Sequence, residues 1–156
     1  MEKIVSVAGF MLTQAIDNLD RKKSIAPMFI GYKKDSKEIK KQINDLSLEQ
    51  SIPKVVSMLE DNQENVENAA ILFPAELEED GKRESVIMLM AQSYANNEYI
   101  MVSLPYKFIN GKLSVASFEL LDYSPFLLEE LPNLEKSFIN GLLSYGDAIE
   151  IWGKEE

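Results

Sequence analysis

The chain has 156 residues, of which 46% are apolar and 27% are charged, and its formal net charge is −10. A chain of this length and balance forms one globular domain with a sizeable core, so we expect a single α+β domain over residues 1–156. Cysteine and histidine are both absent, which excludes disulfides, thiolate nucleophiles, Cys or His metal centres and the side chain most used for proton transfer.

These features set the expected class of function. An acidic surface repels phosphate backbones, so no nucleic acid is expected as a partner. The longest apolar runs are far too short to span a bilayer, so no membrane association is expected either. The sequence therefore predicts a protein that is not an enzyme and that holds no cofactor and no metal.

An amphipathic helix is predicted over residues 3–20. Its apolar residues recur at helical spacing and form one stripe, which consists of Ile4, Val5, Ala8, Met11, Leu12, Ala15, Ile16 and Leu19. The segment is unlike a secretory signal peptide, because Glu2 interrupts the basic start and no small-residue cleavage site follows. We therefore expect a cytoplasmic protein that retains this helix.

A strand is predicted from Ile25 to Tyr32, and the segment after it is ambiguous. Residues 33–43 fit either a hairpin that turns at Asp35-Ser36 or a short helix that Ser36 caps, and we favour the hairpin. The lysines of this segment are expected to mark an exposed sheet edge that resists edge-to-edge pairing.

A second helix is predicted within residues 47–62, where Ser47 and Gln50 match a capping box. The C-terminal part is expected to be helical again, beginning at Ser124-Pro125, with Leu134, Phe138 and Leu142 on its apolar face. Gly146 is expected to end this helix, and a last short strand is expected over Ala148–Trp152.

Between these helical segments, the apolar period changes to that of strands. Turn signals stand at Asp80-Gly81, Asn96-Asn97 and Asn110-Gly111. They divide the segment into an antiparallel meander whose strands lie near 67–77, 85–95, 98–108 and 113–121. The predicted fold is therefore α+β, with an antiparallel sheet of four to six strands flanked by an N-terminal helix, a central helix and C-terminal helical segments.

Two-residue loops fix which side chains share a face of this sheet. A loop at Asn96-Asn97 would place Tyr94 opposite Tyr99 and Met90 opposite Ser103. One face then carries core residues such as Leu89 and Val102. The opposite face, which we call the Met-rich face, is also apolar, and its residues are the predicted binding candidates: Phe73, Met88, Met90, Tyr94, Tyr99, Met101 and Phe118.

An apolar face on both sides of a sheet permits two interpretations. Either helices cover both faces, or one face is a contact surface. The first hypothesis for function is an interaction protein of the cytoplasm, with an accessory, regulatory or toxin-neutralising role and with a protein partner or a second copy bound. The alternative is a small-molecule binding domain with a cavity between the Met-rich face and a covering helix. An enzyme that uses carboxylates with Mg²⁺ ranks third. Glu119 and Asp122 are the candidate carboxylate pair for acid–base catalysis, and only their positions support it.

Overall fold

The computed structural model describes residues 1–44 and 47–143, and these residues form an α+β fold, as predicted. The elements are α1 (Glu2–Asp20), β1 (Met28–Tyr32), β2 (Glu38–Gln42), α2 (Leu48–Glu60), β3 (Asn68–Glu79), β4 (Lys82–Ser93), β5 (Glu98–Ile109), β6 (Lys112–Val115), β7 (Glu119–Tyr123), the 3₁₀ helix η1 (Pro125–Glu130) and α3 (Leu131–Leu143). The stop predicted at Gly146 and the strand predicted over Ala148–Trp152 lie outside the described residues.

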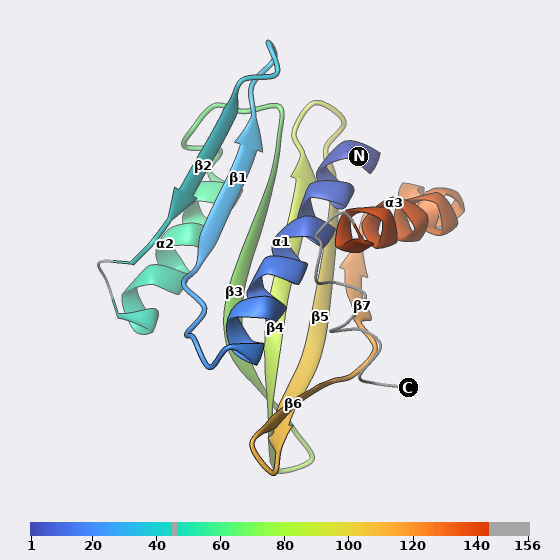
Figure 1. Ribbon diagram of the computed structural model, residues 1–156. Helices are drawn as coiled ribbons and strands as arrows, with labels where there is room; N and C mark the ends of the chain where they lie inside the picture. The colour runs from blue at the N-terminus through green and yellow to red at the C-terminus, as the bar shows by residue number, and fades with distance from the viewer. Residues whose placement is uncertain (45–46, 144–156) are drawn as a thin grey trace.

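All strands belong to one antiparallel sheet with the order β2-β1-β3-β4-β5, and both β6 and β7 pair with β5. Helices α1 and α3 lie on one face of this sheet and α2 lies on the other (Figure 1). The whole predicted stripe of α1 is buried, because it packs against β3, β4 and α3. Helices from the two ends of the chain thus cover one face together.

The segment over residues 33–43 is a hairpin arm, as predicted. Strand β2 forms the sheet edge, and its Lys40 and Lys41 are exposed there. The second helix also forms as expected, and Ser47 is its N-cap residue. Its side chain makes no capping hydrogen bond, however, so the predicted capping box is wrong.

Two of the three predicted tight turns form as expected. Asp80 and Gly81 both have positive φ, and so do Asn110 and Gly111, which is the conformation of type I′ hairpins. The third turn is longer than predicted. Strand β4 ends at Ser93 and β5 begins at Glu98, so a loop of residues 94–97 connects them.

This longer loop shifts the pairing of β4 with β5. Met90 lies opposite Met101 rather than Ser103, and Tyr94 lies in the loop rather than opposite Tyr99. The predicted register is therefore wrong by two residues. A shift of two preserves the alternation of side chains, so the predicted faces of β4 and β5 remain correct.

The predicted strand over residues 113–121 is in fact two strands. Strand β6 ends at Val115, and β7 begins at Glu119 and pairs with a different part of β5. The break resets the alternation, so the placement of Phe118 on the Met-rich face is wrong. Phe118 instead packs among the residues below α1 and α3, with its ring centroid 5.0 Å from that of Phe138.

Candidate functional site

Helices α1 and α3 cross at two glycines, Gly9 and Gly141. A Cβ at Gly9 would overlap the carbonyl oxygen of Phe138, and a Cβ at Gly141 would overlap that of Ser6. At the same crossing, the buried hydroxyl of Thr13 donates a hydrogen bond to the carbonyl oxygen of Leu142, at 3.0 Å. The missing side chains let the two backbones touch, and this contact fixes the height of α3 above the sheet.

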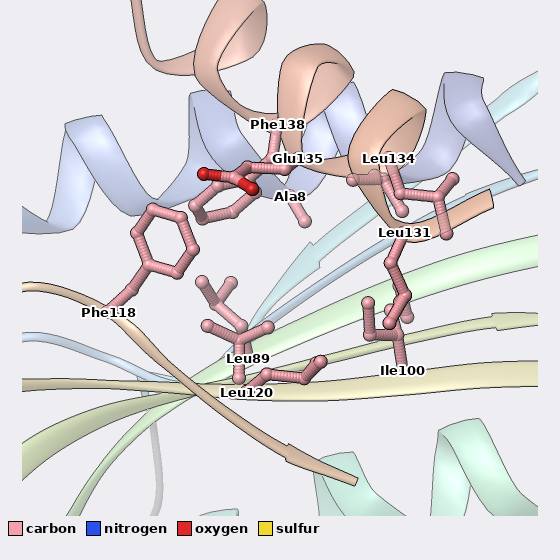
Figure 2. A pocket seen from close by; sticks show the side chains of 12 residues that line it. Ala8, Leu89, Ile100, Phe118, Leu120, Leu131, Leu134, Glu135 and Phe138 are labelled. Atoms are coloured by element: carbon pink, nitrogen blue, oxygen red, sulfur yellow. The ribbon is translucent and has the colours of Figure 1, made fainter. Parts of the chain in front are cut away.

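A cavity of about 230 Å³ lies below this crossing, between the two helices and the sheet (Figure 2). It is lined by Val5 and Ala8 of α1, Leu89 and Ala91 of β4, Ile100 and Val102 of β5, Phe118, Leu120 of β7, and Leu131, Leu134, Glu135 and Phe138 of α3. Each covering element thus contributes to the wall.

The lining residues divide into a buried floor and a more exposed mouth. Side chains such as Leu89, Ala91 and Leu134 are almost completely buried. Leu120 is 41% exposed and lies at the opening. Phe118 is half-buried and meets Phe138 edge to face, at an interplanar angle of 70°. The cavity is therefore an apolar space with an entrance rather than a closed void.

Glu135 supplies the only charged group that lines this cavity within the described part of the chain. Its residue is exposed, and Figure 2 shows the carboxylate beneath α3, at the same end of the space as the rings of Phe118 and Phe138. Among the described residues, this carboxylate is thus the one polar side-chain group at the edge of an otherwise hydrocarbon lining.

Water is a poor occupant of such a space. A buried water usually makes about three hydrogen bonds, and these hydrocarbon walls offer it none below the mouth. An apolar molecule that replaces poorly ordered water gains affinity, since no hydrogen bonds are lost. The cavity is thus better matched to a hydrocarbon group than to solvent.

The predicted binding candidates lie in three different environments. Phe73 and Met88 are buried in a cluster with Val55, Met58 and Leu59 of α2. Met90, Tyr94 and Met101 are half-buried at the margin of this cluster, and Tyr99 is 40% exposed. Phe118 lines the cavity on the other side of the sheet. Helix α2 therefore covers part of the Met-rich face, and the cavity just described lies on the opposite face.

The two tyrosines that the sequence placed opposite each other have separate partners. Tyr94 donates its hydroxyl hydrogen to the carbonyl oxygen of Leu59, in the last turn of α2. Tyr99 donates to a carboxylate oxygen of Asp122 at 3.2 Å, on the surface. The backbone N–H of Tyr94 also donates a hydrogen bond to the backbone carbonyl oxygen of Glu67, at 2.8 Å. Tyr94 thus ties the β4–β5 loop to α2.

Replacing Tyr94 by phenylalanine is expected to cost about 1 kcal/mol of unfolding free energy at pH 7, because the hydrogen bond from its hydroxyl to the Leu59 carbonyl oxygen is lost. Urea denaturation followed by circular dichroism measures this loss. Tyr99→Phe is the matched control, with a loss below about 0.5 kcal/mol expected at its exposed position. Equal losses in the two variants would contradict the tethering role of Tyr94.

The same tether has a pH dependence. Burial raises the pKa of Tyr94 from 10.0 to about 12. A raised pKa means that the folded state keeps its proton longer than the unfolded state. The resulting stabilisation is complete below pH 10 and is lost as the pH rises toward about 12. Tyr94→Phe should therefore lose less stability than the natural protein between these two pH values.

Residue patterns did not reveal the cavity or Glu135, and the signal that could have pointed to them is a glycine within each of two predicted helices. Among the described residues, no group of three or more acidic side chains could hold a metal ion. None of the described helices is both long and apolar enough to cross a bilayer. Comparison of the chain with models of protein families, with curated proteins and with solved structures gives no match in any of the three.

Proposed function

We propose that this protein binds a small apolar molecule in the cavity between α1, α3 and the sheet. The observation that carries the proposal is the cavity itself, about 230 Å³ lined by hydrocarbon and open at one side. Apolar walls that face each other across such a gap lack the packing contacts of a filled core. A chain that keeps such a space gives up stability, and a ligand that fills it returns part of that loss.

The volume limits the size of the ligand. An apolar cavity of about 150 Å³ takes up benzene, with its six carbon atoms, so 230 Å³ accommodates about nine non-hydrogen atoms. A short alkyl chain or a single substituted ring meets this limit. Sterols and long acyl chains contain more atoms than the cavity can hold.

A cavity-filling substitution tests this function. Ala91 is buried and lines the cavity, so Ala91→Leu places three more carbon atoms inside it. We expect the variant to bind 1-heptanol at least tenfold more weakly than the natural protein, as measured by isothermal titration calorimetry. Because the added atoms enter free space, its free energy of unfolding should stay equal or rise by about 1 kcal/mol.

Ala75→Leu is the matched control, since Ala75 lies on β3 among the residues that face α2. This variant should bind 1-heptanol as well as the natural protein does. If Ala91→Leu instead lost about 1–3 kcal/mol, as overpacked cores do, the cavity would be too small to hold a ligand. Unchanged heptanol binding by Ala91→Leu would place the ligand elsewhere.

A second candidate function is a protein contact through the uncovered part of the Met-rich face. The observation in its favour is that α2 packs on β1 and β3, while Tyr99 of β5 remains 40% exposed and Met101 is half-buried. Methionine and tyrosine are both favoured in adaptable interfaces. A second copy of the chain is the simplest partner for such a face, and a charge introduced at Met101 tests it, as set out in the Discussion.

A further inference from the structure

The mouth of the cavity determines which head group a ligand can carry. Glu135 lines the mouth from α3 and is exposed to solvent there. A carboxylate accepts hydrogen bonds and donates none. Within the part of the chain that the structure describes, this carboxylate forms no hydrogen bond and no ion pair. None of the described residues therefore competes with a ligand for its oxygen atoms.

The other side chains that line the cavity further limit which head group a ligand can carry. Every other lining side chain within the described ranges is hydrocarbon, so this part of the wall has no side-chain donor that could hold a carboxylate or a phosphate. An anionic head group would also meet the like charge of Glu135, and a net charge of −10 on the whole chain adds to that repulsion. A neutral hydroxyl could donate one ordinary hydrogen bond. A protonated amine gains both a donor contact and an opposite charge.

We infer that the ligand is a small cationic amphiphile, with an apolar body inside the cavity and a protonated amine at Glu135. This inference rests on the proposed function, because it needs the cavity to be occupied. The buried residues Leu134 and Ala91 line the space for the apolar body of the ligand. The exposed residues Glu135 and Leu120 line the part of the cavity near solvent, where the head group of the ligand would lie. The expected ligand is thus a primary amine with about eight non-hydrogen atoms, which is within the limit of about nine that the cavity volume sets.

Three probes with seven carbon atoms each test the inference by titration calorimetry: heptylamine, 1-heptanol and heptanoate. An exposed charge pair changes affinity by about threefold, so the amine should bind about threefold tighter than the alcohol and the carboxylate about threefold weaker. The ratio of amine to carboxylate affinity is then about tenfold at low salt. It should shrink at 1 M salt, where the Debye length is about 3 Å.

Variants at Glu135 separate the local charge from the overall acidity of the protein. Glu135→Gln should reduce the amine-to-carboxylate ratio to about threefold or less, and Glu135→Lys should reverse the preference. Both variants should remain folded, because Glu135 is exposed and packs in no core cluster. 1-Heptanol carries no charge, so its affinity should change less in each variant than that of the amine or the carboxylate. Glu60→Gln is the control: Glu60 is an exposed residue of α2, on the other side of the sheet, and its loss removes the same charge. This control should keep the tenfold ratio.

The outcomes distinguish the two proposals. If 1-heptanol binds and Ala91→Leu abolishes its binding, but Glu135→Gln leaves the amine-to-carboxylate ratio unchanged, the cationic ligand is wrong and the binding function stands. An equal drop of the ratio in Glu60→Gln and Glu135→Gln would also overturn the role of Glu135. If none of the three probes binds, or if Ala91→Leu binds them all as before, both proposals fail.

Discussion

Replacing Gly141 by alanine is expected to lower the free energy of unfolding by at least about 2 kcal/mol. The added Cβ would overlap the backbone carbonyl of Ser6, and a backbone atom cannot turn aside as a side chain can. Helix α3 would have to move away from α1, which would open the contact between Thr13 and Leu142. The same movement would raise the roof of the cavity, so 1-heptanol should bind more weakly as well.

A loss of stability in Gly141→Ala would be a strict test of the backbone contact, because helix propensity predicts the opposite sign. Helix propensity alone favours alanine over glycine by about 1 kcal/mol in a helix interior. Asn140→Ala, at the exposed neighbouring position in α3, should therefore change the free energy of unfolding by less than about 0.5 kcal/mol or raise it slightly. Urea denaturation of both variants gives the comparison. A stabilised Gly141→Ala would mean that α1 and α3 do not touch through their backbones.

Replacing Met88 by lysine is expected to cost about 3 kcal/mol or more. Met88 is 7% exposed and belongs to the cluster in which Val55 and Met58 of α2 pack on the sheet. A lysine there would leave its charge unpaired among hydrocarbon groups or would push α2 away from β4. Thermal denaturation should show the loss as a clear fall in Tm.

Met101→Lys is the matched control, since Met101 lies on the same face but is only half-buried. A lysine can extend its charged group into water from such a position, so the expected loss is below about 1 kcal/mol. If the uncovered part of the Met-rich face binds a second copy, Met101→Lys should also reduce the assembly size measured by light scattering. An unchanged size would remove that second candidate function. Equal losses of stability at Met88 and Met101 would contradict the position of α2.

The sequence predicted those parts of the fold that local chemistry specifies. The spacing of apolar residues predicted α1, and Asp80-Gly81 and Asn110-Gly111 predicted two hairpins, because each signal acts within a few residues. The predicted register after Ser93 was wrong, and the first residue of the longer loop, Tyr94, donates a hydrogen bond to the last turn of a helix that ends at Glu60. No local pattern contains a partner so far along the chain.

The candidate site was beyond prediction for a related reason. Phe118 was placed on the wrong face because the break between β6 and β7 carries no glycine or proline to mark it. Glu135 lies on a helix whose apolar face was predicted correctly, at Leu134, Phe138 and Leu142. What the pattern could not give is the position of that helix over the sheet. The close contact of α1 and α3 at Gly9 and Gly141 sets the position of α3 over the sheet, and the cavity lies between these helices and the sheet.

The burial of α1 against later parts of the chain also governs the time course of folding. The apolar stripe of α1 packs against β3, β4 and α3, all of which follow it by many residues. Such distant contacts close large loops, and sheets with non-local pairing fold in about milliseconds to seconds. During synthesis α1 emerges before any of its partners, so its stripe stays incompletely covered until residues 131–143 have been made. Over this interval the nascent chain is most exposed to aggregation and has the greatest need of a chaperone.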